Sequence, residues 1–182
     1  MLAEILHKVH WHTIRYNYSD LNYHPNPKSM NTSVDKSLLA FLLALHRLES
    51  PLTDAEVLNL QNNLGTLLEL RPDKETAILE EITTILAKHS GLNQLYQEAM
   101  TKLAPLEEEK LYHRLPPKNL LEQQLGITSG SKGYIDQGKP NQNNTEVVNL
   151  SRMVMTSDRP DKTTKTLNFL QEYWELATTP IF

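Results

Sequence analysis

Cysteine is absent from the 182 residues of this chain. Its absence excludes a disulfide framework and any zinc site built on thiolates, and it fits a reducing compartment such as the cytosol. Long apolar runs are missing too. The first ten residues include the acidic Glu4 and lack the apolar run of about 7–15 residues that a signal peptide needs. No stretch approaches the roughly 18–20 apolar residues of a membrane-spanning helix. The sequence therefore predicts a soluble, cytoplasmic protein.

An excess of basic residues is lacking as well. The chain has 18 Lys and Arg against 22 Asp and Glu, which gives a net charge of −4, and the acidic excess falls within residues 37–125. Proteins that hold nucleic acid unaided usually carry a basic excess, because phosphate contacts supply much of the affinity. Any nucleic-acid contact of this chain is therefore expected to be local and shared with a partner.

Helical apolar spacing runs along nearly the whole chain and predicts an all-α fold, a compact bundle of about six to eight helices. A chain of this length can bury its own core, so we expect a single helical domain over residues 1–182. An opening helix over Glu4 to Arg15 and a long loop make up residues 1–32. Residues 33–125 follow as a helical block, 126–144 as a flexible Gly/Asn-rich loop, and 145–182 as C-terminal helices.

Capping residues set the expected helix boundaries in the block. Ser33 is expected to cap a helix over Val34 to Glu49 that is apolar around most of its circumference and should lie at the centre of the core. Thr53-Asp-Ala-Glu56 has the form of a capping box and predicts the next start. Pro72 is expected where the fourth helix begins and Gly91 where it ends. The predicted core residues are Leu38, Phe41, Leu42, Leu45, Leu64, Leu67, Ile78, Ile82 and Ile85.

The C-terminal part divides into a loop and two helices. Residues 126–144 are rich in Gly, Asn and Ser and cannot bury enough apolar surface to offset their ordering entropy. The two helices are expected over Thr145 to Ser157 and over Pro160 to Thr178. The second of them should pack on the helical block because it carries Phe169, Tyr173 and Trp174.

Two motifs resemble ligand sites but are incomplete. Residues 133–139 match the G-x-x-x-x-G-K pattern of a phosphate-binding loop, but Pro140 replaces the hydroxyl residue that holds Mg²⁺, and no apolar strand precedes the loop. Glu4, His7 and His10 share one helix face, and Glu-x-x-His is half of a carboxylate-bridged di-iron site, whose second half is missing here. We therefore expect a solvated linker, a polar helix face and no metal site.

Catalytic motifs are not found either. The chain has no G-x-S-x-G elbow and no cysteine nucleophile, and Ser129 and Ser131 lie in the loop, where a general base would not be held in reach. The sequence predicts no catalytic residue, no cofactor, no small-molecule substrate and no enzymatic activity.

Basic residues near the C-terminus form the candidate nucleic-acid site. Arg159, Lys162 and Lys165 step by three and predict one ridge at the start of the last helix, which could follow a sugar-phosphate backbone without reading bases. Asp158 and Asp161 lie between them, and mixed charges at a helix start are also common on ordinary solvated surfaces. The candidate residues are Arg152, Arg159, Lys162, Lys165, Lys132, Lys139, Lys8 and Arg15.

Three segments carry a resemblance to a known family. They are the opening run Met1 to Tyr18 with Trp11-His-Thr-Ile-Arg-Tyr16, the core helix Ser37-Leu-Leu-Ala-Phe-Leu-Leu-Ala-Leu-His46, and the closing Lys165-Thr-Leu-Asn-Phe-Leu-Gln-Glu-Tyr-Trp174. In these three segments, in its size and in its all-α pattern, the chain resembles a small subunit of a CRISPR-associated effector complex. More narrowly, it resembles the helical C-terminal domain of the large subunit of type I-D systems, a domain that is also made separately from an internal start codon.

The resemblance implies a non-catalytic helical bundle without cofactor that stacks in two or more copies along a backbone of RNA-binding subunits. Its partners would be the other subunits, copies of itself, guide RNA and target DNA or RNA, with basic side chains on phosphates. The net charge of −4 departs from the basic protein this role favours. The alternative is a helical adaptor or regulatory protein that binds only other proteins, and salt dependence of binding separates the two.

Overall fold

The computed structural model describes residues 33–107, 111–126 and 146–176, and within these ranges the chain is helical and has no strand. The prediction of an all-α helical bundle is confirmed. The helices are α1 (Val34–Arg47), α2 (Asp54–Leu60), a π-helix η1 (Gln61–Gly65), α3 (Thr66–Leu70), α4 (Glu75–Lys88), α5 (Ser90–Leu103), α7 (Lys118–Gln124), α8 (Glu146–Met155), α9 (Pro160–Lys165) and α10 (Asn168–Leu176).

Several predicted segments lie outside the described residues. They are the opening helix and loop over residues 1–32 and, apart from Gly126, the Gly/Asn-rich loop predicted over residues 126–144. The division of the chain into these segments stays a prediction. Within the ranges given above, no helix combines the length and the apolar character that crossing a membrane requires.

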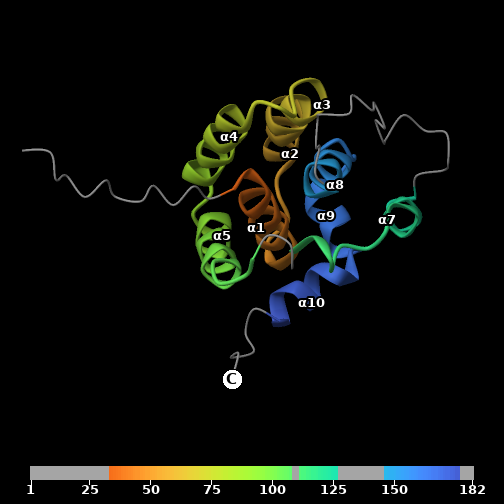
Figure 1. Cartoon of the computed structure of the whole chain (residues 1–182). Coiled ribbons are helices and arrows are strands. Elements are labelled where there is room, and N and C mark those ends of the chain that lie inside the picture. The colour runs from red at the N-terminus through yellow and green to blue at the C-terminus, as the bar shows by residue number, and fades with distance from the viewer. Residues whose placement is uncertain (1–32, 108–110, 127–145, 177–182) are drawn as a thin grey trace, which may run out of the picture. The chain divides into compact units, whose positions relative to one another are not determined.

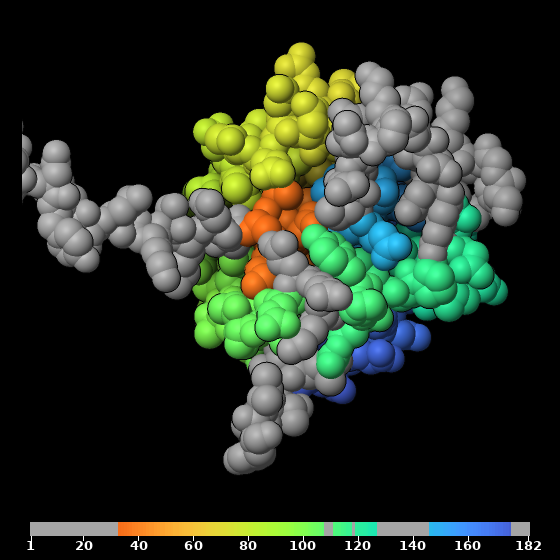
Figure 2. All heavy atoms as spheres, viewed as in Figure 1, coloured from red at the N-terminus to blue at the C-terminus, as the bar shows by residue number. Residues whose placement is uncertain are grey.

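Helix α1 lies at the centre of the core, as its apolar circumference predicts. It packs against α5, α9, α8, α10 and α4, and its residues from Leu38 to Leu45 are at most 1% exposed. Figure 1 shows the other helices arranged around it, and in the space-filling view its orange atoms show only as small areas between its neighbours (Figure 2). A helix that is apolar all round is stable in water only when other helices cover each of its faces.

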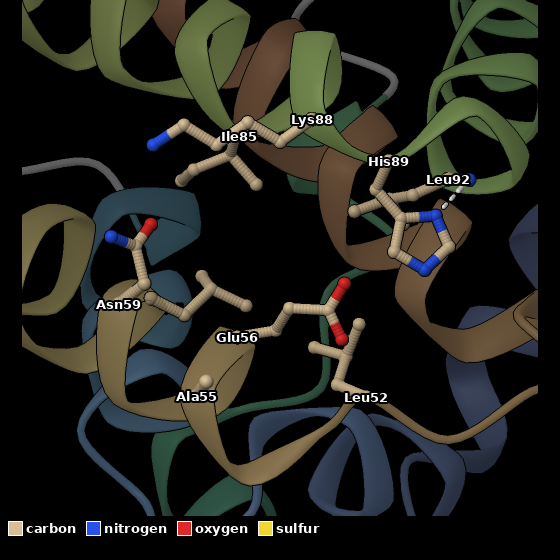
Figure 3. A pocket seen from close by; sticks show the side chains of 9 residues that line it. Leu52, Ala55, Glu56, Asn59, Ile85, Lys88, His89 and Leu92 are labelled. Atoms are coloured by element: carbon tan, nitrogen blue, oxygen red, sulfur yellow. Dashed lines mark hydrogen bonds between the residues drawn. The ribbon is translucent and has the colours of Figure 1, made fainter.

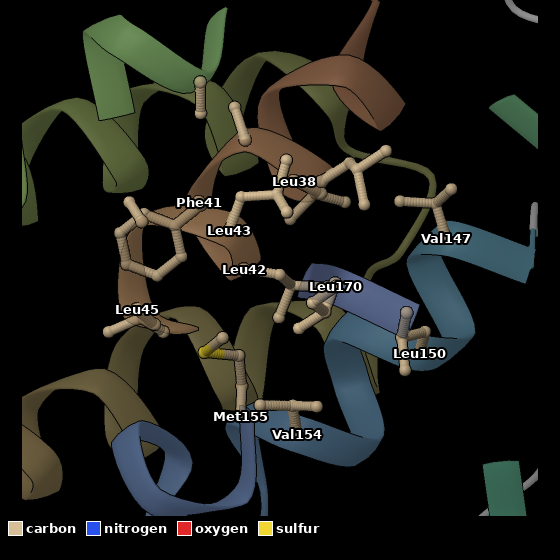
Figure 4. Close-up of a cluster of buried hydrophobic side chains, with 14 of the residues drawn as sticks. Leu38, Phe41, Leu42, Leu43, Leu45, Val147, Leu150, Val154, Met155 and Leu170 are labelled. Atoms are coloured by element: carbon tan, nitrogen blue, oxygen red, sulfur yellow. The ribbon is translucent and has the colours of Figure 1, made fainter. Parts of the chain in front are cut away.

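The core joins segments that are far apart in the sequence. Leu42 and Leu45 of α1 meet Val154 and Met155 of α8 and Leu170 of α10, all of them buried (Figure 4). Every predicted core residue is buried except Leu67, which is partly buried and packs against the core from its edge.

Local capping explains where α1 and α2 begin. The Ser33 hydroxyl accepts the Lys36 N–H at 3.3 Å at the start of α1. At the start of α2, the Thr53 hydroxyl accepts the Glu56 N–H at 3.3 Å while the Glu56 carboxylate accepts the Thr53 N–H at 2.8 Å. Both predicted caps are confirmed. Each satisfies backbone donors that a helix start leaves without partners.

The π-helix η1 interrupts the helical segment that begins after the capping box at Thr53. A Cβ added at Gly65 would lie 3.1 Å from the carbonyl oxygen of Met155, so any larger residue would force the backbone at the end of α8 to move away by a few tenths of an ångström. The Gln61 side chain donates to the Ser157 carbonyl at 2.7 Å on the same side. The extra residue of the π-turn therefore lets the α2–α3 segment pack closely against the end of α8.

Two predicted signals around α4 were wrong. Pro72 lies in the turn before α4, which begins at Glu75. Gly91 does not end α4 but lies in the first turn of α5, because the preceding His89 interrupts the helix with an extended backbone, φ −133° and ψ 91°. The His89 Nδ1 then accepts the Leu92 N–H at 3.1 Å and caps α5.

The predicted single helix over Pro160 to Thr178 is two helices in the structure, α9 and α10. Hydroxyl groups compete for the backbone at the break: the Thr164 hydroxyl donates to the Asp161 carbonyl at 3.0 Å, and the Thr166 hydroxyl donates to the Thr163 carbonyl at 2.8 Å. Such bonds and β-branched side chains weaken a helix. The break turns Leu167 fully into the core, where it is 0% exposed.

Candidate functional site

Arg159, a predicted phosphate ligand, is held in a network of internal contacts. Its guanidinium donates to both Asp161 carboxylate oxygens at 3.1 and 3.0 Å, to the Leu52 carbonyl at 2.8 Å and to Asp54 Oδ1 at 3.0 Å. Asp161 is 2% exposed and also accepts the Leu52 N–H at 3.1 Å. This cluster, which we call the Arg159 clamp, ties the start of α9 to the segment before α2.

The electrostatics of the clamp favour the ionised carboxylate. Burial alone would raise the pKa of Asp161, but the hydrogen bonds from Arg159 and the Leu52 N–H, together with the charge of Arg159, hold that pKa below its ordinary value. A paired and hydrogen-bonded buried ion is stable where an isolated one would not be. The clamp therefore uses the cation of Arg159 to stabilise the fold.

Lys165 also makes internal contacts. Its Nζ donates to the Leu48 carbonyl at 2.8 Å and to the His46 carbonyl at 3.2 Å, at the C-terminal end of α1. The His46 Nδ1 donates in return to the Thr164 carbonyl at 2.9 Å. A cation at this position satisfies carbonyls that have no partner within the helix and suits the negative end of the helix dipole.

Two other candidate phosphate ligands, Arg152 and Lys162, divide between interior and surface. Arg152 is buried in α8 at 6% exposure, whereas Lys162 is exposed on α9. The expectation that Arg159, Lys162 and Lys165 form one solvent-facing ridge, with Arg152 as a further phosphate ligand, is therefore corrected. Arg152 faces the interior, and Arg159 and Lys165 bond to neighbouring segments. Of these candidates in the part of the chain described here, Lys162 is presented to solvent without such a bond. The spacing of three residues predicted a shared helix face, but tertiary packing determines which way each side chain points.

The other predicted basic residues, Lys132, Lys139, Lys8 and Arg15, lie outside the described residues, as do Glu4, His7 and His10. Their proposed contacts stay predictions. Among residues 33–107, 111–126 and 146–176, no group of His, Asp and Glu is arranged to hold a metal ion.

Two further cations pack on Trp174 of α10. The Arg47 guanidinium lies 5.3 Å and the Lys102 Nζ 5.0 Å from the centroid of the indole ring, which is 8% exposed. Arg47 also donates to Gln171 at 3.3 Å. These cation–π contacts join the ends of α1 and α5 to α10. Sequence reasoning missed them because the three residues are distant in the chain.

A pocket of about 210 Å³ lies between α2 and the junction of α4 with α5 (Figure 3). Its apolar wall is formed by four buried side chains. They are Leu52, Leu60, Ile85 and Leu92, none more than 8% exposed. Ala55 and four polar side chains complete the lining. The polar residues are Glu56, Asn59, Lys88 and His89.

The polar groups of this pocket have fixed roles. Hydrogen bonds from the Thr53 hydroxyl and N–H hold the pKa of Glu56 below its ordinary value. His89 Nδ1 accepts the Leu92 N–H, so the neutral ring carries its proton on Nε2 and presents a donor. The pocket therefore combines a fixed carboxylate with a fixed N–H donor at the edge of an apolar wall.

Sequence reasoning did not find this pocket. The capping box identified Glu56 as a residue with a local role, and a histidine immediately before a predicted helix was the only available signal for His89. No periodic pattern shows that α2 packs beside the α4–α5 junction, because that contact arises from tertiary packing.

Comparison with known proteins returned no relative: the chain matches no protein-family model, no curated protein and no solved structure.

Proposed function

We propose that this chain is a non-catalytic, cytoplasmic helical subunit that joins a larger assembly mainly through protein contacts. We propose further that the assembly is the RNA-guided CRISPR effector complex of type I-D that the sequence resembles. The observation that supports the emphasis on protein contacts is the internal use of Arg159 and Lys165, whose donors bond to Asp161 and to backbone carbonyls. Cations engaged in this way are poorly placed to neutralise phosphates as well.

In this role, contact with guide or target strands comes from a small number of point charges. Lys162 on α9 is exposed and, unlike Lys165, is not bonded to the carbonyls at the end of α1, and Lys132, Lys139, Lys8 and Arg15 are the remaining candidates. Phosphate contacts of this kind position the protein and carry no sequence preference. The subunit alone would then bind nucleic acid weakly, and its net charge of −4 points the same way.

The second candidate is a helical adaptor that binds proteins and no nucleic acid. Two large apolar side chains on α2 and α3 favour it, since Leu58 is 56% and Leu70 is 71% exposed. Large exposed apolar side chains are typical of surfaces that another protein covers, although single exposed leucines also occur on ordinary surfaces.

Co-expression with the subunits of a type I-D effector complex tests the first proposal. Stable incorporation is expected, and failure to co-purify with any of them would contradict it. The assembled complex carrying Lys132→Ala, Lys139→Ala and Lys162→Ala should then bind target more weakly, with a log–log salt slope smaller in magnitude by roughly 0.7–0.9 per lost contact. Lys74→Ala is the control, because Lys74 is an exposed cation beside Asp73 at the start of α4 and is not one of the candidate phosphate ligands. Full assembly with an unchanged slope would favour the adaptor.

A further inference from the structure

We propose that the pocket between α2 and the α4–α5 junction receives one apolar side chain of a partner polypeptide, whose peptide group pairs with His89 and Glu56. This inference rests on the proposed function, since it specifies how a protein contact is made. It concerns the pocket lined by Leu52, Leu60, Ile85 and Leu92 on its apolar side.

The size of the pocket fits a single large side chain. Its volume is about 210 Å³, and a dry cavity of roughly 150 Å³ in another protein already holds benzene. A leucine or phenylalanine side chain would therefore enter together with its Cα. Burying such a side chain against an apolar wall supplies most of the affinity of an anchored contact.

The polar edge selects the kind of molecule. The neutral His89 ring presents Nε2–H because its Nδ1 accepts the Leu92 N–H. Both bonds from Thr53 to the Glu56 carboxylate end on Oε2, so Oε1 keeps lone pairs for another donor. Figure 3 shows Glu56 and His89 next to each other on one side of the pocket. A donor beside an acceptor matches a peptide group, whose C=O would accept from His89 and whose N–H would donate to Glu56.

The opposite side of the pocket adds a charge preference. Asn59 of α2 and Lys88 at the end of α4 lie across from Glu56 and His89 (Figure 3). Lys88 is exposed, so it would meet the residues that flank the anchor in the partner. An acidic flanking residue would be attracted and a basic one repelled, which affects association rate and specificity more than affinity.

The probe for this inference is N-acetyl-leucine N-methylamide, titrated into the isolated full chain and followed by amide chemical shifts. We expect shifts at Leu60, Ile85, His89 and Leu92 with a dissociation constant on the order of 1–10 mM, the range for a ligand of this size. The alanine analogue should bind roughly tenfold more weakly because it lacks the apolar body. Absence of shifts at these residues, or equal binding of the two analogues, would overturn the proposal.

Two variants locate the probe. Ala55→Leu should fill the pocket from α2 and abolish binding, whereas the matched control Ala87→Leu, at an exposed position of α4 outside the pocket, should leave it unchanged. Both changes put a good helix former on a helix surface, so both proteins should fold. Equal binding by the two variants would show that the probe sits elsewhere and would refute the pocket assignment.

The pairing with the peptide group has its own test. His89→Asn keeps a side-chain acceptor for the Leu92 N–H but removes the Nε2–H donor, so thermal stability should stay close to that of the parent while probe affinity falls severalfold. Unchanged affinity would refute the pairing. Free leucine binding more tightly than the capped amide would refute a polypeptide partner in favour of a small amino acid. These titrations use the isolated chain, so a failure to join an effector complex would overturn the proposed function without affecting them.

Discussion

Removing Arg159 is expected to destabilise the protein although this residue is far from the centre of the core. Arg159→Ala leaves the buried carboxylate of Asp161, which is 2% exposed, without its cationic partner and dependent on the backbone N–H groups of Leu52 and Lys162. Breaking a buried ion pair from one side costs roughly 3–5 kcal/mol. The Arg159 side chain is 28% exposed and Asp161 keeps two backbone donors, so we expect a smaller loss of about 1–3 kcal/mol.

A double-mutant cycle separates the pair from other effects. Asp161→Asn keeps the shape of the side chain and an acceptor for the Leu52 N–H, and should cost about 1–2 kcal/mol. The double variant should cost less than the two single changes together, with a coupling energy of about 1–2 kcal/mol, because the charge left behind by one change is removed by the other.

Urea denaturation followed by far-ultraviolet circular dichroism measures these free energies of unfolding. The control pair is Asp73 and Lys74, 3.7 Å apart with side chains 52% and 58% exposed, where Lys74→Ala should cost no more than about 0.5 kcal/mol. A loss below about 1 kcal/mol for Arg159→Ala, or strictly additive losses in the cycle, would refute the argument that the clamp ties α9 to the segment before α2.

Three further predictions concern the core, the π-helix and acid stability. Leu42→Asp should abolish the cooperative melt, because a buried unpaired carboxylate costs several kcal/mol against a total stability of about 5–15 kcal/mol. Gly65→Ala should lower the melting temperature, since its Cβ would press on a backbone carbonyl at 3.1 Å. Gly91→Ala, whose Cβ would have its nearest contact at 3.6 Å, should instead stabilise the protein by up to about 1 kcal/mol. A change in stability of the same sign for both variants would contradict the packing described. The lowered pKa of Asp161 contributes stability that is present above the unfolded pKa of about 3.9 and is lost as pH falls through the folded value. In Asp161→Asn, the free energy of unfolding should therefore fall less steeply as the pH is lowered into the acid range. The same steep fall as in the parent protein would contradict this.

Much of the local structure was predictable because its causes are local. The caps at Ser33 and Thr53 and the apolar stripes of α1, α4 and α5 depend on residues within one or two turns. Periodicity alone therefore placed most of the core correctly. The glycine stop signal failed at Gly91, and periodicity failed at the break between α9 and α10, because His89 and a run of threonines compete for backbone groups in ways that these patterns do not report.

The candidate site was much less predictable, because charge pattern does not reveal which partner a side chain will meet. Arg159 and Lys165 looked like members of a solvent-facing ridge, but the structure brings Leu52 and the end of α1 against them. The pocket beside Glu56 and His89 likewise exists only because α2 packs against the α4–α5 junction.

The sequence by itself determined the all-α class, the central position of α1 and the caps that start α1 and α2, since propensity, periodicity and capping act over a few residues. Only the tertiary structure decided the π-turn at Gly65, the internal roles of Arg159 and Lys165, and the pocket. Each of these depends on contacts between residues far apart in the chain, and such contacts form only when helices that are individually unstable in water pack together to bury their apolar faces.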